Sequence, residues 1–281
     1  MAPLVWLVTG CSSGFGRTFV SQILARGDNV IATARKLESI QDLERIGAKI
    51  MQLDVTDDQQ ILNKIADQAI AVYGAVDVLV NNAAYASSAA WEDVDVQEVK
   101  QQFETNVFGV FKVTKAFLPH FRERKTGHLV FISSLVAWVG HQFGGAYAGS
   151  KFGLEGLVES LWRETSPLGI KTLLVEPGMF RTMLGDNMKS VVSKIPDYHE
   201  ASRNHFNMLA GFSGKQPGDP EKGVSVILDF IRGEGSAAGR DFPFRLPLGA
   251  DAYHALAGKC EETLMLLKQH KDVICSTDIS Q

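Results

Sequence analysis

Cysteine is scarce in this sequence, which holds three in 281 residues, at positions 11, 260 and 275. The odd number and the lack of a CxxC pair exclude a disulfide framework and a structural zinc site, and they favour a reducing compartment. The seven histidines are scattered, with no HxxxH or HxxEH pair. The sequence therefore predicts no metal site.

An excess of charge of one sign is also lacking. The 28 basic and 32 acidic side chains leave a formal net charge of -4, and no run of five or six like charges occurs. A protein without an excess of positive charge does not attract a polyanion such as a nucleic acid. We therefore expect no nucleic-acid partner.

Long hydrophobic runs are missing as well. No apolar stretch reaches the roughly 18 residues needed to cross a bilayer, so we expect no membrane insertion. The N-terminal MAPLVWLVTG lacks a basic leader and runs directly into a glycine-rich loop, which is typical of a first strand rather than a signal peptide. Together these absences predict a cytoplasmic protein.

What the sequence does contain is an alternation of short apolar runs with longer amphipathic stretches. The runs are nearly continuous in hydrophobicity, as in a parallel sheet buried on both faces, and they cover residues 4–9, 29–34, 48–54, 76–82, 128–133 and 170–176. The helical pattern that includes Val107 is predicted to stop at Pro119. Strands that alternate with helices predict a Rossmann-type, doubly wound α/β sheet with helices on both faces, in a single domain.

This alternation breaks after Pro177. Residues 178–218 mix methionines and aromatic side chains with polar residues and end in GKQPGDP. The segment is predicted to be a substrate-side insertion, either a lid or a surface excursion, whose apolar side chains line a pocket or fill the core beneath it. A helix over 219–232, a short strand near 241–247 and a helix over 250–270 are expected to complete the chain.

A glycine-rich loop follows the first predicted strand: TGCSSGFGR, residues 9–17, lies directly before a helical stretch. Glycines at such a turn let the backbone pass close to a ligand, and the free amides at the helix start favour a diphosphate. A tight turn without a ligand is the alternative for an isolated glycine triplet. The position of this triplet at the start of a strand and helix series favours a dinucleotide-binding loop.

Gly10, Gly14 and Gly16 match TGxxxGxG, by which the chain resembles the short-chain dehydrogenase/reductase family over residues 4–184. Asp54 in LDVTD matches the family's carboxylate that bonds the adenine amino group, and Thr182 matches the threonine of PGxxxT that reaches the nicotinamide carboxamide. Residues 81–84 resemble the NNAG motif, with alanine in place of its glycine. The resemblance implies a cofactor site made of Gly10, Ser12, Ser13, Gly14, Phe15, Gly16, Arg17, Arg35, Lys36, Asp54, Val55, Asn82, Ala83, Tyr147, Lys151, Pro177, Gly178 and Thr182.

The second predicted strand ends in TARK, with Arg35 and Lys36 and no acidic residue before Glu38. Enzymes that use NAD commonly place a carboxylate here for the ribose 2′-hydroxyl, whereas a basic side chain accommodates a 2′-phosphate. A guanidinium suits phosphate by its charge and its fork geometry, and Arg17 could add to the same field. The alternative is that these basic side chains are merely solvated at a strand end. We expect a preference for NADP(H) over NAD(H).

Tyr147 and Lys151 lie four residues apart in YAGSK, so a helix places them on one face. Taken alone, that spacing favours an exposed amphipathic pair. Hydride transfer, however, needs a proton moved on or off the substrate oxygen, and a neighbouring ammonium and the nicotinamide cation would lower the pKa of a tyrosine for that task.

The family resemblance extends to this region. YAGSK matches YxxxK, with Tyr147 as acid/base and Lys151 as the cation beside it. Ser134 lies thirteen residues before the tyrosine, as the family's substrate-orienting serine does, which leaves Ser133 structural. Asn106 matches the asparagine that supports a water relay to the lysine, although a helix-interior amide that bonds its own backbone is the alternative.

The resemblance therefore implies an NADP(H)-dependent oxidoreductase that interconverts a carbonyl and a secondary alcohol. A medium or large hydrophobic substrate is predicted if the bulky residues near this tetrad line a pocket rather than fill a core; they are Tyr85, Trp91, Trp138, His141 and Phe143. A non-redox family member (epimerase, dehydratase or cyclase) and a nucleotide-sensing protein on the same fold are the alternatives. Members of the family are commonly dimers or tetramers, so a homodimer or homotetramer is also implied.

Overall fold

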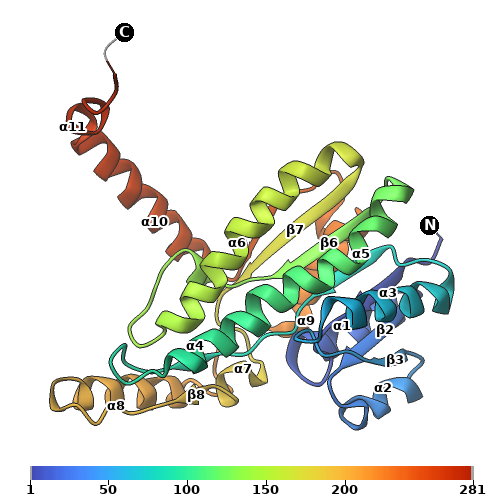
Figure 1. The fold of residues 1–281 in the computed structure, drawn as a ribbon, viewed down its shortest axis with the longest axis horizontal. Helices are drawn as coiled ribbons and strands as arrows, with labels where there is room; N and C mark the ends of the chain where they lie inside the picture. The colour runs from blue at the N-terminus through green and yellow to red at the C-terminus, as the bar shows by residue number, and fades with distance from the viewer. Residues whose placement is uncertain (1, 280–281) are drawn as a thin grey trace.

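A seven-stranded parallel sheet of order β3-β2-β1-β4-β6-β7-β9 organises the computed structural model, which describes residues 2–279 (Figure 1). Its strands are β1 Val5–Val8, β2 Asn29–Ala34, β3 Lys49–Gln52, β4 Val78–Asn81, β6 Gly127–Ile132, β7 Ile170–Pro177 and β9 Arg245–Leu248. A separate two-stranded sheet pairs β5 Ser87–Ser88 with β8 Lys189–Ser190. Each of the six apolar runs overlaps one strand of the large sheet within two residues at either end, and the short strand expected near 241–247 is β9.

Helices cover both faces of the large sheet, as predicted. They are α1 Gly14–Ala25, α2 Gln41–Arg45, α3 Gln59–Tyr73, α4 Val96–Phe103, α5 Val110–Arg124, α6 Gly145–Thr165, α7 Met183–Asp186, α8 Pro196–Gly211, α9 Pro220–Arg232, α10 Ala250–Gln269 and α11 Lys271–Cys275. Short 3-10 turns are η1 Leu37–Ser39, η3 Leu135–Ala137, η4 Ser166–Leu168 and η5 Gly235–Ala237, while η2 Glu104–Gly109 is a π-helical turn between α4 and α5.

The alternation of side chains along β1 separates two hydrophobic layers. Trp6 and Val8 pack into the layer that contains α1 and α9, whereas Val5 and Leu7 pack into the layer that contains α3, α5 and α6. Successive strand residues point to opposite faces of a sheet, and both faces are covered here. The Rossmann-type fold predicted from continuous apolar runs is confirmed.

The strand order reverses beside β1, because β2 and β3 follow on one side while β4, β6, β7 and β9 follow on the other. At such a switch point the connections leave in opposite directions, and a crevice opens at the carboxyl ends of the strands. The loops after β1, β4, β6 and β7 all emerge at this edge. The polar residues singled out in the sequence follow these strands, so the topology brings them together.

The prediction that a helix stops at Pro119 is wrong. Helix α5 continues to Arg124 with the proline inside it, on its exposed side. Proline removes the bond to the carbonyl of Lys115, but that residue is also exposed and water can replace the lost donor. The following turn is held by tertiary contacts: Phe121 is fully buried, and Arg124 Nη2 lies 2.7 Å from Asp77 Oδ1.

Residues 178–218 form α7, β8 and α8, and α8 lies at the edge of the molecule below α4 (Figure 1). The aromatic residues Phe143 and Phe206 meet across the boundary with ring centroids 6.1 Å apart, and Tyr198 Oη donates to Glu92 Oε1 at 2.7 Å. Met183, Met208 and Phe212 are 49%, 52% and 42% exposed, so they do not fill a core beneath the segment.

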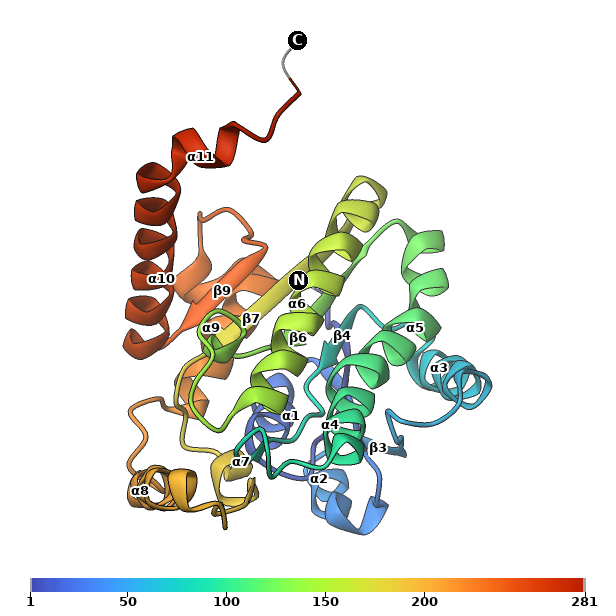
Figure 2. The ribbon, with the colours of Figure 1, turned by 60° about the vertical axis from the view of Figure 1, so that its left-hand side comes forward.

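The last two helices extend away from the sheet (Figure 2). Helix α10 packs its first turns near β9 through the buried Ala252 and Leu256, and beyond Gly258 its side chains are exposed. In the described part of the chain, no helix combines the length and apolar character needed to cross a membrane.

Candidate active site

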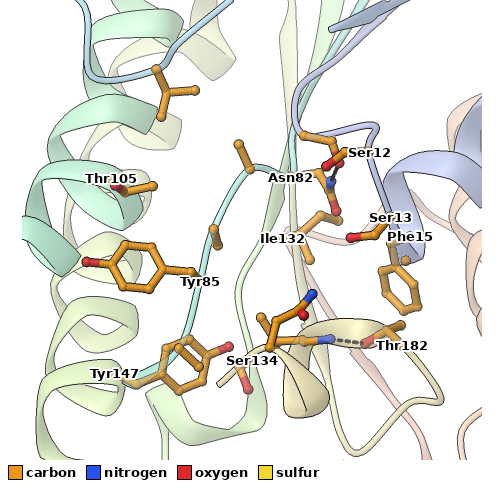
Figure 3. Close-up of a pocket in the computed structure, with 18 of the residues that line it drawn as sticks. Ser12, Ser13, Phe15, Asn82, Tyr85, Thr105, Ile132, Ser134, Tyr147 and Thr182 are labelled. Carbon is orange, nitrogen blue, oxygen red and sulfur yellow. Dashed lines mark hydrogen bonds between the residues drawn. The ribbon is translucent and has the colours of Figure 1, made fainter. Parts of the chain in front are cut away.

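A cavity of about 1000 Å³ opens at the carboxyl ends of the strands, beside the switch point. Most of the site residues predicted from the sequence line it: Gly10, Ser12, Ser13, Gly14, Phe15, Arg35, Asp54, Val55, Asn82, Ala83, Ser134, Tyr147, Lys151, Pro177, Gly178 and Thr182. The predicted residues that do not line it are Gly16, Arg17, Lys36 and Asn106. Figure 3 shows Tyr85, Thr105 and Tyr147 on one side of the cavity and Ser12, Ser13, Phe15 and Thr182 on the other.

The glycine loop has a backbone that larger residues could not adopt. Gly10 and Gly14 have φ of +71° and +53°, in the left-handed region that favours glycine. A Cβ on Gly16 would lie 2.3 Å from the carbonyl oxygen of Gly10, which explains its need for glycine although it does not line the cavity. The side chain of Ser13 makes no capping bond to the first turn of α1. The amides of that turn therefore remain available to an anion, and this loop fits the diphosphate of a dinucleotide.

The segment after β4 is tied to the glycine loop. Thr9 Oγ1 accepts hydrogen bonds from the backbone amides of Asn82 and Ala83 at 2.9 and 3.0 Å. The Asn82 side chain donates back to the carbonyl oxygens of Thr9 and Gly10 at 2.8 and 3.1 Å. These bonds hold two walls of the cavity at a fixed separation (Figure 3).

The basic residues predicted near the second strand lie in different surroundings. Arg35 lines the cavity and is exposed, and within the described residues its guanidinium has no ion-pair partner. Lys36 is exposed outside the cavity. Arg17 instead forms an ion pair with Asp42 and donates to the carbonyl oxygen of Ser39 at 3.3 Å. The Arg17 guanidinium is thus directed toward Asp42, and its contribution to the field of the site stays a prediction.

Asp54 follows β3 and lines the far end of the cavity. Its Oδ1 accepts hydrogen bonds from the backbone amide and hydroxyl of Thr56, at 2.9 and 2.7 Å. This local turn orients the carboxylate, whose second oxygen can accept a further bond.

The predicted catalytic side chains converge. Ser134 follows β6 by two residues and precedes η3, while Tyr147 and Lys151 lie in the first two turns of α6, and all three border the cavity. Ser134 hydrogen-bonds the Tyr147 hydroxyl. Figure 3 shows both side chains at the cavity. Lys151 Nζ donates to the carbonyl oxygen of Ile132 at 2.7 Å and lies 5.9 Å from the centroid of the Tyr147 ring. The pair is thus not the exposed amphipathic pair that its spacing alone favoured.

Burial shifts the protonation equilibria of the pair. It raises the pKa of Tyr147 to about 12, and the hydrogen bond from Ser134 acts against that rise. It also lowers the pKa of Lys151 to about 8, against an opposing effect of Glu155. A nearby ammonium is expected to lower the Tyr147 pKa. The protein's own groups raise the pKa instead, because the effect of burial is larger than that of the Ser134 hydrogen bond. Near neutral pH the phenol is an acid and the lysine a cation.

Asn106 is fully buried in the π-helical turn η2 and does not reach the cavity. Its Oδ1 accepts from the backbone amide of Tyr85 at 3.1 Å, and its Nδ2 donates to the Tyr85 carbonyl oxygen and to Ser150 Oγ at 2.9 and 3.0 Å. Ser150 in turn donates to the carbonyl oxygen of Tyr147 at 2.7 Å. Asn106 thereby links the wall that carries Tyr85 to the helix that carries Tyr147, rather than bonding its own helix.

The bulky residues expected to shape a substrate pocket divide into two groups. Tyr85 lines the cavity, but Trp91, Trp138, His141 and Phe143 do not. Trp91 is 84% exposed, and the Trp138 indole donates to a buried glutamate behind the site. The Phe143 ring faces α8, where its centroid lies 5.5 Å from that of the His205 ring and 6.1 Å from that of the Phe206 ring, while the Phe143 carbonyl oxygen accepts bonds from residues 88 and 89.

Other residues of the cavity wall were not predicted. They come from α4, η2 and the 178–218 segment: Gln101, Glu104, Thr105, Leu184, Asn187, Lys189 and Gln216. Met179 and Phe180 line it as well, in agreement with a pocket-lining role for some residues of that segment. These residues carry no local motif, and their proximity depends on how separate segments pack.

Comparison with known proteins gives consistent matches. The family model described as short chain dehydrogenase matches residues 4–192. The chain is 36% identical over 266 residues to Oxidoreductase BOA17 of Botryotinia fuckeliana, covering 92% of this chain and 93% of that protein. It is 38% identical over 207 residues to a 3-ketodihydrosphingosine reductase of Bacteroides thetaiotaomicron, covering 73% and 74%.

A solved structure of a short-chain dehydrogenase from Streptomyces avermitilis has the same architecture. The two chains superpose with a TM-score of 0.87 at 37% sequence identity, over 99% of each chain. This similarity extends past the region matched by the family model and includes the C-terminal helices.

Proposed function

The chain belongs to the short-chain dehydrogenase family, and on that basis we propose that it is an NADP(H)-dependent oxidoreductase that interconverts a carbonyl and a secondary alcohol on a medium or large hydrophobic metabolite. The observation that carries the proposal is the convergence of Ser134, Tyr147 and Lys151 on the cavity that the glycine loop also lines. A site for a dinucleotide and a site for proton transfer thereby share one space.

The proposed mechanism follows from the protonation states of these side chains. The bound nicotinamide supplies the hydride. Ser134 donates a hydrogen bond to the substrate oxygen and holds it beside the phenol of Tyr147, which is protonated near neutral pH because burial raises its pKa to about 12. During reduction the Tyr147 hydroxyl delivers its proton to the carbonyl oxygen, and in the reverse oxidation the phenolate takes it back.

Lys151 has a separate proposed task. Its ammonium is held by the Ile132 carbonyl oxygen and lies beside the Tyr147 ring, so it stabilises the phenolate that remains once the proton has left. We assign the nicotinamide ribose hydroxyls to the same ammonium. Asn106 acts at a distance, through Ser150 and the backbone of Tyr147.

The preference for NADP(H) is supported by Arg35. It lines the cavity at the end of β2, and no carboxylate of the described chain pairs with it, so its guanidinium is available to a 2′-phosphate. Gly10, Gly14 and the first amides of α1 are assigned to the diphosphate, Asp54 to the adenine, and Thr182 to the carboxamide.

A hydrophobic substrate is supported by the composition of the cavity wall. Beyond the assigned cofactor residues, the polar wall residues named above are accompanied by apolar or aromatic side chains that could contact such a substrate: Ala84, Tyr85, Ala86, Met179 and Leu184. One relative is a 3-ketodihydrosphingosine reductase, and we propose that this chain also accepts a ketone on a long or bulky apolar body. Residues 178–218 would cover that body as a lid.

A panel of carbonyl compounds tests the proposal. The purified protein is incubated with NADPH and a long-chain ketone, a steroid ketone, a hydrophilic keto acid and an aldose, and NADPH consumption is followed by its absorbance. We expect turnover of at least one apolar ketone and much weaker turnover of the hydrophilic compounds. Activity confined to the keto acid or the aldose would contradict the proposed substrate class, and product formation without NADPH consumption would contradict redox chemistry.

A further inference from the structure

A cluster of buried charged residues lies directly behind the proposed catalytic residues. Glu155 of α6 and Glu176 of β7 are 6% and 0% exposed, and both carboxylates contact the guanidinium of Arg245 from β9. The Trp138 indole also donates to Glu176 Oε1 at 2.9 Å. None of these residues belongs to the motifs that indicated the site. Removing charged groups from water is costly, so their burial here points to a role beyond packing.

Glu155 holds the strand end that carries the catalytic serine. Its Oε1 accepts a hydrogen bond of 2.6 Å from Ser133 Oγ, and its Oε2 lies 2.6 Å from Arg245 Nη1. Ser133 is the residue between Ile132, whose carbonyl oxygen receives the Lys151 ammonium, and Ser134, which bonds the Tyr147 hydroxyl. A bond at Ser133 therefore fixes both neighbours at once.

Glu155 also follows Lys151 by one helical turn, so the carboxylate and the ammonium lie on the same side of α6. Lys151 is 2% exposed, and burial lowers its pKa to about 8 while the charge of Glu155 opposes that fall. Burial also raises the pKa of Glu155, and the hydrogen bonds from Ser133 and Arg245 act in the opposite direction, toward the carboxylate form.

The titratable groups around this point come from three elements. Helix α6 contributes Tyr147, Lys151, Glu155 and Glu159, strand β7 contributes Glu176, and strand β9 contributes Arg245. Strand β6 contributes the Ile132 carbonyl oxygen, and the residues after it contribute only serine hydroxyls. Among these groups, Glu155 is the one whose charge opposes the fall of the Lys151 pKa. The loss of one carboxylate would thus favour the neutral lysine.

We propose that Glu155 is a positioning residue for the reaction: through Ser133 it places Ser134 and the Ile132 carbonyl, and its carboxylate supplies the negative charge that balances the Lys151 ammonium. This inference rests on the proposed function of the site. It assigns a role to a residue outside the Asn, Ser, Tyr and Lys set.

Glu155→Gln tests the charge, because it keeps a group that can accept the Ser133 bond. The matched control is Glu159→Gln, which removes a carboxylate that contacts the same Arg245 at 3.3 Å but lies one turn further along α6, where its side chain is 40% exposed. We measure kcat/KM for the best ketone with NADPH from pH 6 to 10, and in parallel the Kd for NADPH at each pH by tryptophan fluorescence.

Lys151 is active as a cation, so activity is retained below its pKa and lost as the pH rises through it. The alkaline limb is the fall of kcat/KM at high pH. We expect this limb, and the loss of NADPH affinity at high pH, to occur about one pH unit lower in Glu155→Gln than in the wild type. The limb of Glu159→Gln should stay at the wild-type pH. An unmoved limb in a folded Glu155→Gln, or an equal shift in both variants, overturns the charge role.

Two further variants separate charge from positioning. Ser133→Ala keeps the Glu155 carboxylate but removes its hydrogen bond to the residue between Ile132 and Ser134. Because roughly one hydrogen bond to a charged group is lost, kcat should fall about tenfold. The pH of the alkaline limb and the Kd for NADPH should not change. Unchanged kcat overturns the positioning role. If Glu155→Gln does not fold, Glu155→Asp replaces it: its retained charge must leave the limb unmoved, and a displaced limb overturns the proposal.

These outcomes are distinct from failure of the proposed function. If the wild-type protein reduces no carbonyl, the proposed function fails. The pH dependence of NADPH binding still reports whether Glu155 controls the charge of Lys151.

Discussion

Replacement of Arg35 by alanine gives the most direct test of the proposed cofactor preference. The guanidinium lines the cavity without an ion-pair partner among the described residues, so a 2′-phosphate would receive its charge undiminished. Hydrogen bonds between charged groups contribute about 1.5–3 kcal/mol each. Because Arg35 is exposed, screening by solvent reduces that value to about 1.5–2 kcal/mol for the whole contact, which corresponds to a roughly 10- to 30-fold rise in Kd.

The assay is tryptophan fluorescence titration with NADPH and NADH at low and high salt. NADH lacks the phosphate, so its Kd should change less than about twofold in Arg35→Ala. Lys36→Ala removes the same charge from the neighbouring exposed position outside the cavity, and we expect it to weaken NADPH binding less than about threefold. Wild-type protein that binds NADH as tightly as NADPH, or an Arg35→Ala variant that loses affinity for both equally, would refute the reasoning.

Three other predictions concern catalysis and stability. Tyr147→Phe should lower kcat by about 10²–10⁴-fold and leave the NADPH Kd within about twofold, because only the acid is removed; full activity would refute its role. Wild-type reduction should decline above pH 8, since the Lys151 cation, with its pKa lowered to about 8 by burial, is lost as the pH rises; a flat rate to pH 10 would argue against it. Arg232→Gln leaves the Asp28 carboxylate, 1% exposed, without its ion-pair partner, and should reduce the free energy of unfolding in urea by about 3 kcal/mol. Arg163→Gln, which breaks an exposed pair on α6, should cost less than about 0.5 kcal/mol, and equal losses in the two variants would contradict this account.

The sheet could be predicted from the sequence because its strands are covered on both faces. Burial on two faces demands apolar residues at successive positions, and each of the six runs overlaps a strand. Three of the runs extend one residue past the carboxyl end of their strand, to Thr9, Asn82 and Ser133, whose side chains bond neighbouring segments. Boundary errors of this kind fall where the site begins.

The error at Pro119 has a different origin. A proline in the sequence predicts the loss of one helical hydrogen bond. It gives no information on how strongly tertiary contacts stabilise the turn that follows. The burial of Phe121 and the ion pair of Arg124 depend on neighbours far along the chain. Tertiary contacts therefore override the local signal.

The candidate site was predictable where a motif encodes backbone geometry or a helical spacing. Gly10, Gly14 and the pair Tyr147 and Lys151 are such cases. The substrate-side wall was not, since Trp138 and Phe143 are close to the tetrad in sequence but do not line the cavity, and the Phe143 ring packs against α8. Glu155 carries no motif that the resemblance supplied, and its contacts with β6 and β9 appear only in the folded chain.

The small β5–β8 sheet has a consequence for how this protein could change its substrate in evolution. It joins the segment after Tyr85 to the 178–218 segment by backbone bonds, Lys189 N to Ala86 O at 3.3 Å and Val191 N to Ser88 O at 3.0 Å. The two segments are about a hundred residues apart in sequence, yet both contribute to the cavity wall and are paired with each other. We therefore expect that substrate selectivity cannot be transferred between relatives by exchanging one segment. Exchanging either segment alone would disrupt the β5–β8 pairing that shapes the cavity wall, whereas exchanging both together would transfer the selectivity.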